Sequence, residues 1–123
     1  MLLFTAKSAG WTDGIRLPDR EGYVTDGPFL RRDGDKLWMF WASFKNDEKG
    51  ESQYAEGIAL SENGVLGPWK HQEPMFTRDG GHGMVFEDFD GQTFFVLHRP
   101  NTKTEHPVFF PLSFEGGKWS VTE

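Results

Sequence analysis

The chain has 123 residues, a formal net charge of -6 and no cysteine. This length suits one domain or part of one, and the negative balance gives no basic field for nucleic acid. Without cysteine there is neither a disulfide framework nor a thiolate metal site. Residues 1–4 are too short for a signal h-region and no later segment approaches membrane-spanning length. We therefore expect no membrane partner and, by default, a cytoplasmic location.

Aromatic residues and turn residues dominate the composition. Twelve phenylalanines and five tryptophans supply large apolar side chains, while fifteen glycines and seven prolines interrupt the chain. The interruptions come about every eight to ten residues, a spacing that favours an all-β fold of short strands. In chain order, the expected strands cover 2–6, 23–30, 36–44, 54–61, 67–71, 83–87, 93–98, 108–114 and 118–121.

Two parts of the chain repeat one another. Gly34 and Gly91, each in an Asp-Gly turn, are 57 positions apart, and this spacing pairs Phe40 with Leu97. Units of four short strands and about fifty residues are typical of β-propeller blades. A β-sandwich is the alternative for the same strands, but it does not require the repeat.

The repeat divides the chain into three parts. Residues 22–71 and 75–123 each form a blade, closed by Trp69 and Trp119 respectively. Residues 1–20 resemble the outer half of a preceding blade. The expected architecture is thus a single partial propeller domain of about two and a half blades, too few to close a ring.

The sequence around Asp26 holds one carboxylate at a forced bend. Gly27 tolerates backbone angles that other residues avoid, and Pro28 fixes its own φ, so Asp26 lies at a strand edge. An Asx-type turn, bonded only to the local backbone, is the alternative. The repeat puts Asp26 and His82 at equivalent strand starts. We therefore predict that they share one polar site at the mouth of a central channel.

A series of motifs keeps a fixed order over roughly residues 22–113. They are VTDGPFL (24–30), LWMFW (37–41), SF (43–44), YAEGIA (54–59), GPW (67–69), GGHGM (80–84) and HRPN (98–101). In type and spacing they resemble family 43 glycoside hydrolases. The resemblance implies the C-terminal part of a five-bladed propeller that cleaves xylosides or arabinosides of plant cell-wall polysaccharide (xylan, arabinan) with inversion, using three acidic residues.

The resemblance also implies roles for two residues. Asp26 has the place of the general acid, one methylene shorter than the usual Glu, and His82 that of a His facing a central metal ion or its water. The general base and a pKa-tuning Asp belong to earlier blades, and no motif here matches them. Inverting hydrolysis needs two carboxyl groups about 6.5–9.5 Å apart. We expect weak or absent activity from this chain alone.

Aromatic residues near strand ends are candidates for sugar contacts. Trp41 and Phe44 could stack on a sugar ring, and His98 could line the channel. No cofactor is required. An ion near His82 would be a hard cation such as calcium, held mostly by water. The alternative functions are a non-catalytic carbohydrate-binding or scaffold propeller module, and a truncated product that folds without further activity.

A partial propeller leaves surfaces that attract partners. An unmatched half blade and an open blade face would leave strand edges and aromatic side chains in water. Closed two-fold symmetry is the commonest way for identical chains to cover such a surface. We therefore expect a homodimer that rebuilds a propeller-like ring and brings two Asp26 side chains towards a common channel.

Overall fold

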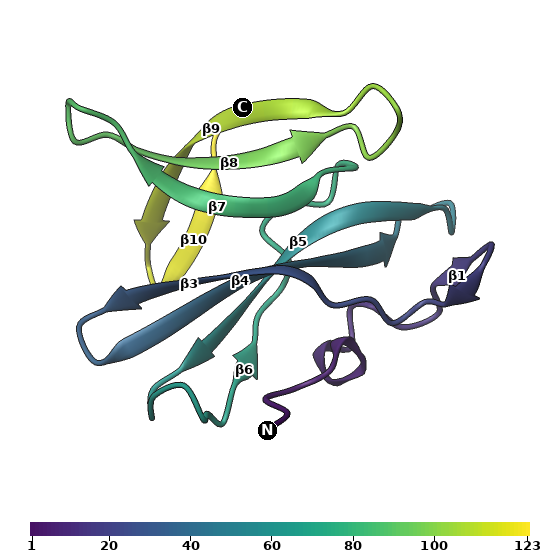
Figure 1. Cartoon of the computed structure of the whole chain (residues 1–123), viewed down its shortest axis with the longest axis horizontal. Helices are drawn as coiled ribbons and strands as arrows, with labels where there is room; N and C mark the ends of the chain where they lie inside the picture. The colour runs from purple at the N-terminus through teal and green to yellow at the C-terminus, as the bar shows by residue number, and fades with distance from the viewer.

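The computed structural model describes the backbone of residues 1–123 and all side chains except those of Arg20 and Glu21. It contains two four-stranded antiparallel sheets and one two-stranded sheet, as the all-β prediction requires (Figure 1). The elements are the 3-10 helix η1 (Ala6–Ala9) and the strands β1 (Arg16–Leu17), β2 (Arg20–Glu21), β3 (Asp26–Asp33), β4 (Lys36–Asn46), β5 (Ser52–Ser61), β6 (Lys70–His71), β7 (Gly81–Glu87), β8 (Thr93–Arg99), β9 (His106–Glu115) and β10 (Lys118–Val121).

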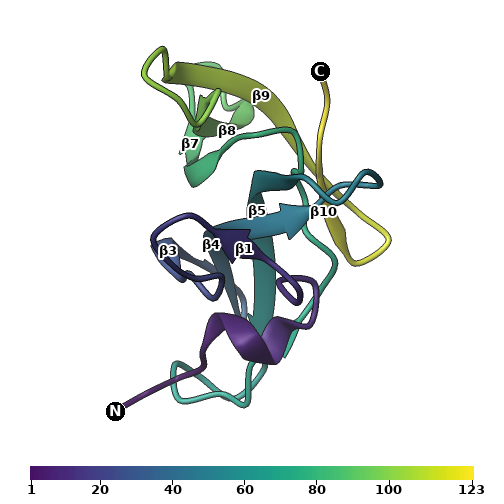
Figure 2. The same ribbon diagram turned by 90° about the vertical axis from the view of Figure 1, so that its right-hand side faces the viewer.

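Each four-stranded sheet is a meander of consecutive strands. The first sheet has the order β3-β4-β5-β6 and the second the order β10-β9-β8-β7. The second sheet lies against one side of the first, and the N-terminal segment lies near the other (Figures 1 and 2). This arrangement of two stacked four-stranded units is that of neighbouring propeller blades.

Strand β4 is buried on both faces. Trp38 and Phe40 belong to the core shared with the second sheet, whereas Met39 and Trp41 belong to a core shared with the N-terminal segment. The two sets alternate because successive side chains of a strand point to opposite faces. Burying each of these side chains contributes about 1.5–3 kcal/mol, so both cores stabilise this strand.

The core between the sheets is largely aromatic. The ring of Phe40 lies 5.3 Å from that of Phe95 in β8, and Trp38 lies 5.9 Å from Trp119 in β10. The tryptophans that close the two units occupy matching places. Trp119 packs into the core against the first sheet, and Trp69 packs into the core on the N-terminal side of that sheet.

The N-terminal segment differs from the sequence prediction. The strand expected at 2–6 is wrong: residues 1–5 form no regular element, and a 3-10 turn follows from Ala6 to Ala9. The segment nevertheless covers the first sheet, because Phe4 and Trp11 lie 5.5 Å and 5.0 Å from the ring of Trp41. That residues 1–20 are half of a preceding blade stays a prediction.

The register of the repeat also differs. In the first sheet Phe29, just after a bulge, pairs with Phe40, and in the second sheet Met84 pairs with Val96 in the same way. Phe40 therefore corresponds to Val96, 56 positions on, and not to Leu97. A shift of one residue in this alignment assigns each side chain to the opposite face of the sheet. Phe40 faces the second sheet, while Leu97 faces back to the first.

The second sheet exposes apolar side chains on the face turned away from the first. Met84, Phe86 and Phe109 are 49%, 45% and 54% exposed. Val96 pairs with both Met84 and Phe109, so these side chains share one face. Among the elements that the structure describes, no helix is long and apolar enough to cross a membrane.

Candidate functional site

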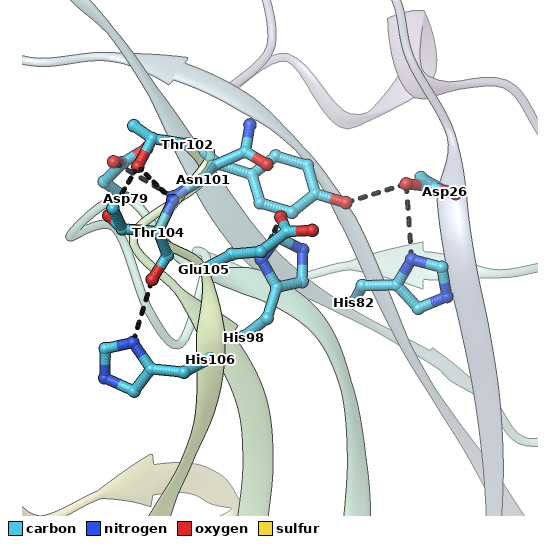
Figure 3. A network of polar contacts seen from close by, with 10 residues as sticks. Asp26, Asp79, His82, His98, Asn101, Thr102, Thr104, Glu105 and His106 are labelled. Atoms are coloured by element: carbon cyan, nitrogen blue, oxygen red, sulfur yellow. Dashed lines mark hydrogen bonds and ion pairs between the residues drawn. The ribbon is translucent and has the colours of Figure 1, made fainter.

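Asp26 is the first residue of β3 and meets residues from two other strands. Its Oδ1 accepts a hydrogen bond from the Gly27 N–H at 3.0 Å, a contact to the next residue and not the bond to the second residue on that defines an Asx-type turn. Its Oδ2 accepts one from the Tyr54 hydroxyl at 2.8 Å. Nδ1 of His82 lies 3.4 Å from the same oxygen (Figure 3). Asp26 and His82 therefore meet across the boundary between the sheets, while their place at the mouth of a central channel stays a prediction.

His82 adopts an uncommon backbone conformation at the bulge of β7. Its φ is 56°, and Gly27 at the equivalent bulge of β3 has a φ of 51°. The absence of a side chain at Gly27 makes room for the imidazole, since a Cβ there would lie 2.5 Å from Cδ2 of His82. One bulge therefore supplies a space and the other supplies the ring that enters it.

The Asp26–His82 contact contributes little to the stability of the fold, and its main effect is to place the two side chains together. Their side chains are 47% and 54% exposed. Water screens charges at such exposure, and ion pairs of this kind contribute little. The pair instead presents a carboxylate and an imidazole together at a half-exposed edge.

Tyr54 in β5 is the buried donor of the site. Its side chain is 3% exposed. Burial first, and then the hydrogen bond and charge of Asp26, raise the pKa of Tyr54 well above its usual range. The phenol therefore stays protonated and donates to the Asp26 carboxylate.

Glu56, two residues further along β5, is a fully buried carboxyl group. Its exposed fraction is 0%, and its Oε2 accepts a hydrogen bond from the Gly83 N–H at 3.2 Å. Burial raises the pKa of Glu56 to about 8, with a smaller contribution from the charge of Asp26. Glu56 is therefore a neutral acid at pH 7.

A cavity of about 360 Å³ opens beside Asp26. Its lining combines carboxylate, amide, imidazole and aromatic groups, which is the mixture that small polar ligands require. The lining residues are Leu17, Pro18, Asp19, Val24, Asp26, Phe44, Tyr54, His98 and Asn101. Three of the predicted site residues, Asp26, Phe44 and His98, thus line one cavity.

Aromatic contacts fix the wall of this cavity. The ring of Tyr54 lies 5.1 Å from Phe44 and 5.3 Å from His98. Oε2 of Glu105 lies 3.4 Å from Nδ1 of His98, without forming a hydrogen bond to it (Figure 3). Phe44 and His98 therefore form part of the cavity wall, and their contact with a ligand stays a prediction.

Trp41 does not fit the predicted role in sugar stacking. Its side chain is 0% exposed and lies in the core under Phe4 and Trp11. Its neighbour Phe44 lies on the opposite face of β4, which explains why only Phe44 reaches the cavity. The prediction for Trp41 is corrected: it is a core residue.

A metal ion at His82 stays a prediction, and the described side chains give it little support. Among them, no three His, Asp or Glu groups are placed to hold a metal ion. His82 has Asp26 as its neighbour instead. The donor set of the described side chains does not fit a cation held by protein ligands.

Sequence reasoning missed Tyr54 and Glu56. Both side chains lie on the face of β5 that turns to the second sheet, the same face as the core residue Ile58. A signal was present, because a glutamate at an inward position of an apolar strand is buried and must find a partner. Alternation alone would have marked Glu56 as interior.

Solved structures similar to this chain are glycoside hydrolases. The endo-arabinase of Bacteroides thetaiotaomicron VPI-5482 is 44% identical over 94% of this chain and 41% of its own, with a TM-score of 0.82. A thermostable family-43 glycoside hydrolase is 24% identical over 80% of this chain and 35% of its own, with a TM-score of 0.65. The α-L-arabinanase of Cellvibrio cellulosa, solved with arabinohexaose, is 21% identical over 82% and 38%, with a TM-score of 0.59.

The chain spans less than half the length of these proteins. No family model and no curated protein matches it. At 24% and 21% identity the second and third structures show a shared fold, whereas the first adds sequence similarity over nearly the whole chain. The resemblance predicted from the motifs is confirmed: the chain has the fold of part of a glycoside hydrolase β-propeller, with sequence similarity to an endo-arabinase and a fold shared with a family-43 glycoside hydrolase.

Proposed function

We propose that the cavity beside Asp26 binds arabinofuranosyl oligosaccharides, with Asp26 in the general-acid position of a family 43 glycoside hydrolase. One observation carries this proposal. The motif residue Asp26 opens onto a cavity of about 360 Å³ in a chain that is 44% identical to an endo-arabinase. Arabinosides are preferred over xylosides because that relative is named for arabinan cleavage.

The lining suits a sugar. Phe44 offers an apolar ring face to sugar C–H groups, while Asn101 and Asp26 offer hydrogen-bonding groups to hydroxyls. Tyr54 holds one oxygen of Asp26 and thereby fixes the direction of its carboxylate. Binding is therefore the part of the function that these residues support directly.

Cleavage needs more than Asp26. Inversion requires a second carboxyl group about 6.5–9.5 Å away to activate water. The sequence carries no match to the motif of that general base. We accordingly expect weak or absent hydrolysis from this chain alone, and a non-catalytic carbohydrate-binding module is the alternative.

Calorimetry with arabinohexaose and turnover of aryl α-L-arabinofuranoside and aryl β-D-xyloside test the proposal. We expect measurable arabinohexaose binding, weakened about tenfold in Asp26→Asn for the loss of roughly one charged hydrogen bond. Asp33→Asn is the matched control, because Asp33 is exposed at the far end of the same strand.

The outcomes separate the alternatives. Arabinoside turnover that disappears in Asp26→Asn and persists in Asp33→Asn indicates a hydrolase. Binding without turnover indicates a binding module. A wild-type protein with neither arabinohexaose binding nor turnover contradicts the proposal.

We also propose that two copies associate through the open face of the second sheet. Met84, Phe86 and Phe109 are each about half exposed there. Full burial of one such side chain contributes about 1.5–3 kcal/mol, so covering its exposed half contributes roughly half of that. Sedimentation equilibrium should give a dimer at micromolar concentration and a monomer for Phe109→Glu. A well-folded wild-type monomer at that concentration would refute this assembly.

A further inference from the structure

Glu56 lies in the same row of the first sheet as Asp26. Asp26 pairs with Ala42, and Ala42 pairs with Glu56, so the three side chains share one face across β3, β4 and β5. That face turns to the second sheet. Glu56 is 0% exposed, so no ligand in the cavity contacts it directly. Its role has to be sought in the protein itself.

The carboxyl of Glu56 faces two successive backbone amides of β7. The Gly83 N–H donates to Oε2 at 3.2 Å, and the adjacent His82 N–H is close enough to the same carboxyl to lower its pKa slightly. These two nitrogens flank the Cα of His82. A backbone amide that donates to a buried acceptor is restrained, because leaving it unpaired in the interior would be costly.

Glycines bring β7 close enough for this contact. A Cβ at Gly81 would lie 2.8 Å from a ring carbon of Tyr54 and 3.0 Å from Cβ of Ala42. A Cβ at Gly83 would collide with the ring of Phe95. The backbone on both sides of His82 is therefore pressed against the neighbouring side chains, within reach of Glu56.

His82 itself needs such support. Its φ of 56° lies in the left-handed region, which costs a non-glycine residue roughly 1 kcal/mol or more. A residue keeps this conformation only when its surroundings impose it. In this conformation the imidazole lies over Gly27, 3.4 Å from Oδ2 of Asp26.

We propose that Glu56 is a positioning residue, whose buried carboxyl holds the two amides that flank the Cα of His82 and so directs the imidazole onto Gly27 and Asp26. Its relevance to sugar binding rests on the proposed function above. The contact between the residues does not. If Glu56 only satisfied the hydrogen-bonding needs of nearby amides, replacing it would leave the imidazole of His82 in place.

Nuclear Overhauser contacts at pH 6 test the placement. In the wild type, Hδ2 of His82 should show a contact to the Hα protons of Gly27, since the ring carbon lies against that residue. Glu56→Gln keeps an oxygen acceptor and should keep the contact. Glu56→Leu removes the acceptor and should lose it, with hydrogen exchange at the Gly83 amide at least about tenfold faster.

Ile58→Ala is the matched control for lost stability. Ile58 is buried on the same face of β5 but lies in the apolar core, so its truncation should keep the His82–Gly27 contact. Retention of the contact in folded Glu56→Leu overturns the proposal, as does its loss in Glu56→Gln.

Arabinohexaose affinity of the same variants separates this inference from the proposed function. A selective loss of affinity in Glu56→Leu supports a role in the sugar site. A wild-type protein that shows the predicted contact but binds no oligosaccharide refutes the proposed function, while the placement of His82 by Glu56 stands.

Discussion

Replacing Glu56 by Gln should change how the stability of the protein depends on pH. The pKa of Glu56 is about 8 in the folded protein against an ordinary value of 4.5. Between these values the folded protein keeps a proton that the unfolded chain has lost. The contribution of Glu56 is therefore fully present below pH 4.5 and is lost as pH rises through 8.

The size of the effect follows from the same interval. One pH unit corresponds to about 1.4 kcal/mol, so the interval from 4.5 to about 8 corresponds to at most roughly 5 kcal/mol. Local opening and entry of water reduce this, and we expect about 3–5 kcal/mol. Gln carries no proton to lose, and its oxygen can accept the Gly83 N–H as the neutral acid does.

Denaturant unfolding from pH 5 to pH 9 measures the difference. At pH 5 Glu56→Gln should lie within about 1 kcal/mol of the wild type, and at pH 9 it should be more stable by several kcal/mol. Comparing the two proteins removes the contributions of Asp26 and His82, which face the same region. Glu48 is exposed, so the stability difference between Glu48→Gln and the wild type should not grow between pH 5 and pH 9. A wild-type-to-variant difference that is equal at pH 5 and pH 9 would refute the reasoning.

Three further substitutions test the packing around the site. Tyr54→Phe removes a hydroxyl that donates to a carboxylate and should cost about 1–2 kcal/mol in denaturant unfolding at pH 7; an unchanged stability would mean that the bond contributes nothing. Gly83→Ala puts a Cβ into the ring of Phe95 and should cost roughly 2 kcal/mol or more, whereas a neutral result would mean that β7 can move aside. Phe4→Ala uncovers Trp41 and should shift tryptophan emission to the red; unchanged emission would contradict the packing of the N-terminal segment.

Strands with local signals could be predicted from the sequence. The strand Lys118–Val121 agrees with its prediction, and the other strands from residue 36 onwards differ at their ends by up to three residues. Turn residues mark where each strand ends, and the apolar runs between them are too short for helices. The meander order then follows from short connections.

The register of the repeat could not be read from turn glycines. Gly34 lies in a turn between the paired residues Asp33 and Lys36, while Gly91 lies in the longer connection between Glu87 and Thr93. Aligning glycines from turns of unequal length displaces the strands that follow. A displacement of one residue is enough to exchange the buried and open faces.

The covering of Trp41 and the contacts of Glu56 depend on tertiary structure. Alternation predicts that one face of β4 is buried, but not that residues 3–11 return to cover the other. Similarly, the motif around His82 predicts a polar site without showing which side chain holds its backbone. Such contacts join residues far apart in the sequence, and no local pattern encodes them.

The site arises from a difference between two otherwise equivalent bulges. Each sheet has one at the start of its first strand, and each bulge holds a residue with positive φ. Where the first sheet has Gly27, the second has His82, so the second fills the space that the first leaves open. Two glycines, or two bulky residues, at these positions would give either a gap or a collision. Stacking of two similar blades therefore suffices to bring an imidazole onto Asp26, provided that a buried group such as Glu56 holds the unfavourable backbone of His82.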